Sequence, residues 1–167
     1  MCTAFSSWQK LNECKRDPEL VKREYTKAMV HLRFVCELYR AQMDSGLYFL
    51  HEHPVAASSW KEQCVDDLLD DPRVDRITGD QCQYGQEAYD GRPVRKPTGW
   101  MSNGYKILQS LAKRCTGQGG ACGRRGGGRH ELCSSDAARA AAIYPLRLCK
   151  AILTGARNQL RQKNGGA

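Results

Sequence analysis

The most regular hydrophobic pattern of the chain runs from residue 20 to residue 43. Apolar residues recur there at three- and four-residue spacing: Leu20, Val21, Tyr25, Ala28, Met29, Leu32, Val35, Cys36, Tyr39 and Met43. This spacing puts the apolar side chains on one face of an α-helix. Asp17 can cap the helix with Pro18 in its first turn, and Gly46 can end it. The pattern predicts one long helix from residue 18 to about residue 45.

Shorter patterns follow and predict both strands and helices. Residues 47–51 form a near-continuous apolar run that ends before Pro54, and residues 74–78 and 98–102 predict two more strands. Helical spacing recurs over residues 58–69, after a cap at Asn103, and from residue 136 to about residue 160 with an interruption at Pro145. Strands that alternate with helices favour an α/β fold with a mostly parallel sheet.

The length of 167 residues suits one ordinary domain, or part of one. We expect an α/β segment over residues 1–115 and a basic helical segment over residues 135–167. Between them, residues 116–134 are rich in glycine and arginine, and glycine has no side chain with which to build a core. We therefore expect a flexible loop there.

The charge of the chain is unevenly distributed. The formal net charge is +8, and residues 104–167 hold 12 of the 26 Lys and Arg residues but only two acidic residues, Glu131 and Asp136. A basic segment of this kind can contact the phosphates of nucleic acid, or it can simply keep the protein soluble. Charge alone leaves both interpretations open.

Nine cysteines occur without a preceding charged and apolar leader, so we expect free thiols in a reducing compartment, the nucleus or the cytoplasm. No apolar run approaches the roughly 20 residues that span a bilayer, and we expect no membrane partner.

Four possible metal ligands bracket the glycine-rich loop: Cys115, Cys122, His130 and Cys133. Thiolates and imidazoles are the donors that zinc prefers, but this spacing is not that of a known finger or knuckle. A structural zinc site and unligated thiols in a loop are the two alternatives.

Three segments resemble motifs of the cytosine-C5 DNA methyltransferases. Residues 2–6, Cys-Thr-Ala-Phe-Ser, resemble the family's Pro-Cys-x-x-Phe-Ser loop without its proline. The sequence Leu-His-Glu-His-Pro at residues 50–54 resembles the Glu-Asn-Val segment, with histidines on both sides of the glutamate. Residues 84–86, Tyr-Gly-Gln, with the basic residues at 92, 95 and 96, resemble the region that contacts the base and the backbone. Segments 49–54 and 96–103 are also similar to segments beside retrotransposon polyproteins of protists.

The resemblance implies catalytic roles for Cys2, Glu52 and Arg95. Cys2 would add to C6 of a flipped cytosine and Glu52 would protonate N3, while the loop that contains Arg95 would hold the base. The nucleic-acid contacts, to DNA rather than RNA, would come from three segments. These are the Cys-Thr-Ala-Phe-Ser motif with Ser6, the loop of Arg95 with Gln86, Arg92 and Lys96, and the glycine-rich loop with Arg124, Arg125 and Arg129.

The resemblance further implies a partial Rossmann-like sheet and S-adenosylmethionine as the methyl donor. The strand and glycine-rich turn that would hold this cofactor are missing before Cys2. We therefore expect a truncated or degenerate methyltransferase-like domain that is inactive alone. The alternative is a non-catalytic, basic nucleic-acid-binding module of a retroelement protein, stabilised by zinc.

Overall fold

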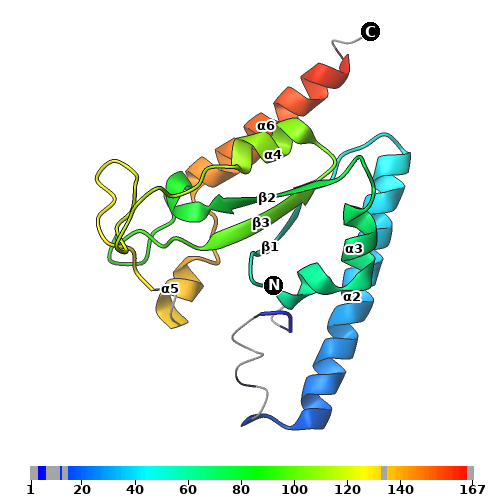
Figure 1. The fold of residues 1–167 in the computed structure, drawn as a ribbon, viewed down its shortest axis with the longest axis horizontal. Coiled ribbons are helices and arrows are strands. Elements are labelled where there is room, and N and C mark those ends of the chain that lie inside the picture. Colours follow the sequence, from blue (N-terminus) through cyan, green and yellow to red (C-terminus); the bar gives the residue numbers. More distant parts are fainter. Residues whose placement is uncertain (1–3, 7–11, 13–14, 133–134, 165–167) are drawn as a thin grey trace.

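The computed structural model describes residues 4–6, 12, 15–132 and 135–164 (Figure 1). The helices of this part of the chain are α2 (Pro18–Asp44), α3 (Gln63–Leu69), α4 (Tyr105–Leu111), α5 (Ser135–Ala140) and α6 (Leu146–Asn164). Its strands are β1 (His51–Pro54), β2 (Asp75–Asp80) and β3 (Pro97–Ser102), and two 3-10 turns are η2 (Ser58–Lys61) and η3 (Gln81–Tyr84).

The three strands form an antiparallel sheet in the order β1-β3-β2. The prediction of a mostly parallel, Rossmann-like sheet is therefore wrong. Neighbouring parallel strands need a long crossover, usually a helix, whereas β2 and β3 are joined by η3 and a loop without an α-helix. The segment with α3 does return the chain parallel to β1, but β3 lies between β1 and β2.

Helices cover both faces of this sheet, with α2 and α3 on one side and α4 and α6 on the other (Figure 1). Successive side chains of β3 point to opposite faces. Met101 accordingly packs in the core with Leu32 and Leu68, and Trp100 packs in the core with Leu108 and Leu148. Complete burial of a side chain such as leucine contributes about 1.5–3 kcal/mol, so both cores hold the helices on the sheet.

The predicted ends of the first helix are confirmed. The Asp17 carboxylate accepts a hydrogen bond from the Glu19 N–H at 3.0 Å, and Pro18 starts the helix. Gly46 follows the last turn with φ +69°, a left-handed conformation that glycine adopts without a steric penalty.

Other boundaries differ from the predictions. The first strand covers residues 51–54 instead of 47–51. Only Phe49 of the apolar run 47–50 is buried, and the run pairs with no described strand. The predicted cap of α4 is also wrong, since Gly104 occupies that position. Asn103 instead pins the segment before β1: its side chain accepts from the Phe49 N–H at 3.0 Å and donates to the Leu47 carbonyl at 2.9 Å.

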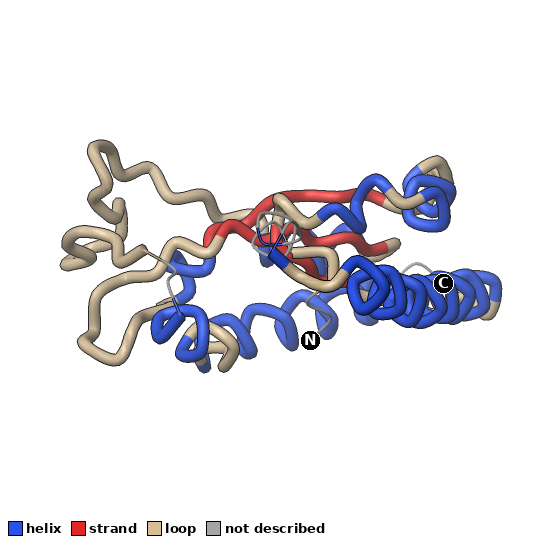
Figure 2. The backbone as a smooth tube through the Cα atoms, turned by 90° about the horizontal axis from the view of Figure 1, so that it is seen from below, coloured by secondary structure: helices blue, strands red, loops and turns tan. Residues whose placement is uncertain are grey.

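Long loops gather beyond one end of the sheet (Figures 1 and 2). They comprise the connection between β2 and β3 and the segment that follows α4. These loops bring together the side chains of the candidate site.

Candidate metal centre

Three thiols and one imidazole converge in these loops: Cys82, Cys115, Cys122 and His130. One donor atom from each residue lies within 4.8 Å of the others. Cys115 Sγ is 3.9 Å from Cys122 Sγ and 3.6 Å from His130 Nε2. The three cysteines are buried together, and the four donors could hold a metal ion.

The glycine-rich segment brings two of these donors together by closing on itself. The Cys122 N–H donates to the Gly128 carbonyl at 2.7 Å, and the His130 N–H donates to the Gly120 carbonyl at 2.8 Å. Gly120 has φ +84°, which a residue with a Cβ rarely adopts. Gly117 lies where a Cβ would come within 2.0 Å of the Ala121 carbonyl oxygen. The glycines therefore permit a compact turn with hydrogen bonds across it.

The orientation of His130 suits a ligand. Its Nδ1 lies 3.1 Å from the Gly120 carbonyl oxygen, which can only accept a hydrogen bond. The proton is therefore assigned to Nδ1, and the lone pair of Nε2 points to the sulfurs. Metal-bound histidines commonly donate their second N–H to a carbonyl in this way.

The thiols differ in how readily they ionise. Burial raises the pKa of Cys82 to about 12. Burial also acts to raise the pKa of Cys115, but hydrogen bonds from the Gly123 and Gly117 N–H groups and with the Cys82 and Cys122 thiols together outweigh it, and the net shift is downward. A cation placed among the sulfurs would stabilise all three thiolates.

A buried carboxylate holds the backbone of one candidate ligand. Asp80, at the end of β2, is completely buried and its Oδ2 accepts the Cys115 N–H at 2.8 Å. Two arginines neutralise it: Arg114 Nε lies 3.1 Å from Oδ2, and Arg95 Nε lies 3.4 Å from Oδ1. Asp80 thus fixes the backbone of one ligand to the sheet.

The structure brings together three of the four predicted metal ligands, Cys115, Cys122 and His130. The predicted fourth, Cys133, lies outside the described residues, and Cys82 occupies the remaining position. Sequence spacing missed Cys82 because it lies far from the other ligands along the chain. The available signal was its place in the loop that follows the predicted strand 74–78.

The predicted catalytic residues do not form a shared site among the described residues. Cys2 lies outside them. Glu52 pairs with Trp100 in the sheet, on the face covered by α4 and α6, and interacts with Tyr144. Burial and this carboxylate both raise the pKa of Tyr144. Arg95 is engaged elsewhere, with Asp80 beside the metal centre.

Several residues that were predicted to contact nucleic acid are buried or already bind other residues of the chain. Gln86 is 3% exposed. Arg92 pairs with Asp90 and Glu131, and Lys96 donates to the Ala141 carbonyl at 2.7 Å. Ser6 is half-buried beside Phe5. The contacts of these residues with nucleic acid stay predictions.

Two of the three arginines in the glycine-rich segment are better placed for an external ligand. Arg124 pairs with Glu87 and donates to the Cys82 carbonyl. Arg125 and Arg129 are exposed, and neither has an ion pair within the described ranges. These two guanidinium groups are available at the surface of the turn that carries the metal donors.

A polar groove of about 620 Å³ separates this turn from the start of α6. Arg124 and Arg125 line it from the turn, and Arg147 lines it from α6. Gln83 and Gly85, beside the ligand Cys82, contribute to the same surface. Glu87 also lines the groove and pairs with Arg124, so Arg125 and Arg147 give the groove a net positive charge next to the candidate metal centre.

None of the described helices is long and apolar enough to cross a membrane. Comparison of the chain with family models, with curated proteins and with solved structures finds no match.

Proposed function

We propose that this chain is a zinc-stabilised module that binds the phosphate backbone of nucleic acid. The observation that carries the proposal is the placement of Arg125 and Arg147 on a groove next to four convergent metal donors. The metal would fix the turn, and the turn would hold Arg125 across the groove from Arg147 of α6.

Zinc is the metal that best suits these donors. With Zn–S bonds of about 2.3 Å and Zn–N bonds of about 2.0–2.1 Å, a tetrahedral site has S–S separations of about 3.8 Å and S–N separations of about 3.5 Å. The observed separations of 3.9 Å and 3.6 Å agree with both values. A zinc ion held by four protein donors has no open coordination position, which is typical of a structural site.

Phosphate is the ligand class that suits the groove. Guanidinium groups bind phosphate oxygens through paired N–H donors, and the whole segment after residue 104 has a large excess of basic residues. Phosphate contacts give affinity without sequence specificity. We do not extend the proposal to methyl transfer, because the parallel sheet that the methyltransferase resemblance implied is absent from the described fold.

The test is the salt dependence of binding to a short labelled DNA duplex, measured by fluorescence anisotropy, with RNA of the same sequence as a second probe. The logarithm of the affinity should fall linearly with the logarithm of the salt concentration. Arg125→Ala and Arg147→Ala should each reduce the slope by about 1, since each removes one phosphate contact.

Arg23→Ala is the matched control. Arg23 is an exposed arginine on α2, away from the groove, and its removal should leave the slope unchanged. Binding that does not respond to salt, or that weakens equally with Arg23→Ala, would overturn the proposal. Removal of zinc with a chelator should weaken binding at least as strongly as Arg125→Ala, because the turn that carries Arg125 would lose its anchor.

A further inference from the structure

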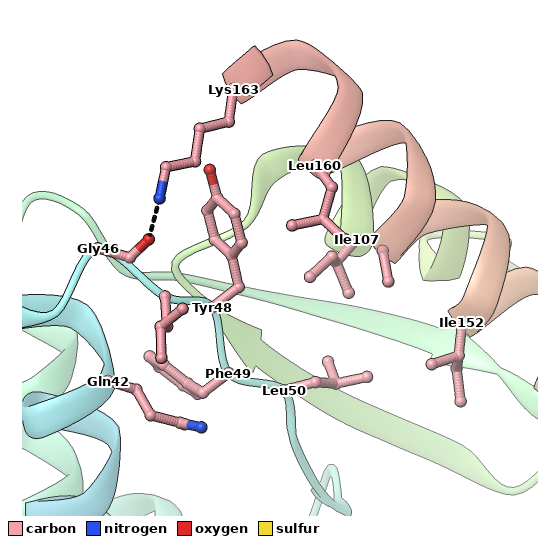
Figure 3. Close-up of a pocket in the computed structure, with 11 residues that line it drawn as sticks. Gln42, Gly46, Tyr48, Phe49, Leu50, Ile107, Ile152, Leu160 and Lys163 are labelled. Carbon is pink, nitrogen blue, oxygen red and sulfur yellow. Dashed lines mark hydrogen bonds between the residues drawn. The ribbon is translucent and has the colours of Figure 1, made fainter.

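A second groove lies along the C-terminal half of α6 and is lined mainly by apolar side chains (Figure 3). It has a volume of about 400 Å³ and runs between the segment before β1 and the C-terminal half of α6. Leu50, Ile152 and Leu160 supply much of its apolar lining. Lys163 closes one end, where its Nζ donates to the Gly46 carbonyl at 2.6 Å.

Exposed leucines continue this apolar surface along α6. Leu146, Leu153 and Leu160 are 68%, 69% and 53% exposed, and they recur every seven residues. A seven-residue repeat keeps side chains on one side of a helix. Leu160 belongs both to this leucine stripe and to the groove. Contiguous exposed apolar surface of this kind marks interaction sites.

The circumference of α6 has a definite order. Leu148 and Gln159 are buried against the domain. At about 100° per residue, the groove side chains come next, the leucine stripe follows, and basic residues lie beyond it. These basic residues are Lys150, Arg157 and Arg161. The helix from Leu146 to Asn164 contains no acidic residue at all.

The order of apolar and basic residues around α6 favours one kind of ligand for the groove over others. A second copy of α6 would bring basic residues against basic residues, which is unfavourable. A flat anionic bilayer could contact the leucines but would not fill a concave groove. A helix with an apolar edge and acidic flanks satisfies both the shape and the charge.

We propose that the groove and the leucine stripe bind an acidic amphipathic helix of a protein partner. Its apolar side chains would enter the groove beside Ile152 and Leu160, and its carboxylates would face Arg157 and Arg161. The leucine stripe meets the arginine groove only at Leu146, and the residues named for partner binding, Ile152, Leu160, Arg157 and Arg161, do not line that groove. This inference therefore does not depend on the proposed binding of nucleic acid.

The test uses the full zinc-loaded chain and a labelled synthetic peptide with leucines at i, i+3, i+4 and i+7 and glutamates on both flanks. A peptide of the same composition in scrambled order is the reference. Fluorescence anisotropy should show at least about tenfold tighter binding of the ordered peptide, since the energy comes from aligned apolar side chains.

Two variants probe the surface, and one serves as a control. Leu153→Ser combined with Leu160→Ser should weaken peptide binding about tenfold or more, and Arg157→Glu should weaken it further at low salt. Val30→Ser combined with Phe34→Ser removes exposed apolar side chains from α2 and should have no effect. Circular dichroism verifies that every variant is folded.

Equal affinity for the ordered and scrambled peptides would overturn the proposal. Binding to vesicles that contain phosphatidylserine, without binding to the peptide, would assign the surface to a membrane instead. A dimer detected by light scattering and abolished by the leucine variant would assign it to a second copy. Either of the last two results also contradicts the proposed partner.

Discussion

The carboxylate of Asp80 accepts a hydrogen bond from the backbone N–H of Cys115 at 2.8 Å. This contact joins the end of β2 to the segment that bears a candidate metal ligand. Asp80 is a positioning residue, because it holds the backbone of a ligand without being one itself. Partners of this kind are the outer shell that orients a metal site.

Replacement of Asp80 tests this relationship. Asp80→Asn keeps the size of the side chain but removes the charge that Arg95 and Arg114 compensate. Zinc affinity, measured by competition with a chelator, should fall about 10- to 100-fold. The free energy of unfolding should fall by about 1–3 kcal/mol. Asp75→Asn, at the exposed start of β2, should change neither quantity. Unchanged zinc affinity in Asp80→Asn would refute the positioning role.

The burial of the His51 imidazole predicts how the free energy of unfolding depends on pH. Burial lowers the pKa of His51 to about 4, with smaller contributions from His53 and Arg76, whereas the unfolded chain titrates near 6.5. The unfolded state therefore binds more protons between these values, and stability is lost as the pH falls through this range. His51 should account for a loss of about 2 kcal/mol between pH 7 and pH 5.

Urea denaturation of the wild type and of His51→Gln at both pH values measures this contribution as the difference between the two proteins. Protonation of the metal ligands affects both proteins equally and therefore cancels. His31→Gln changes an exposed histidine and serves as the control. A pH dependence in His51→Gln that equals that of the wild type would show that another group is responsible.

Two leucines of α6 test whether this helix is an integral part of the fold. Leu148 is completely buried in the core with Trp100, and Leu153 is 69% exposed. Leu148→Ala should lower the free energy of unfolding by about 2–5 kcal/mol because it leaves a cavity. Leu153→Ala should lower it by less than about 0.5 kcal/mol. Similar small effects of both changes, measured by denaturation, would mean that α6 does not dock on the sheet.

The sequence predicted the helices better than the sheet, and the reason is physical. Asp17, Pro18 and Gly46 act within a few residues of the positions they control, so the ends of α2 could be predicted. Strand direction depends on which distant segments pair. The apolar run before β1 contained no information that β3 would lie between β1 and β2.

The candidate site was predicted in part for the same reason. Cys115, Cys122 and His130 lie close together in sequence and flank a glycine-rich turn, so their convergence could be expected. Cys82 joins them only because β2 ends where this turn lies. The resemblance to methyltransferases rested on short motifs, and residue order alone did not determine the fold around Glu52.

The metal content of the purified full chain, measured by elemental mass spectrometry, tests the central claim most directly. We expect about one zinc ion per chain in the wild type and in Cys133→Ser, and little zinc in Cys82→Ser. Absence of zinc from the wild type would contradict the account. Retention of zinc in Cys82→Ser with its loss in Cys133→Ser would contradict the ligand set that the fold assembles.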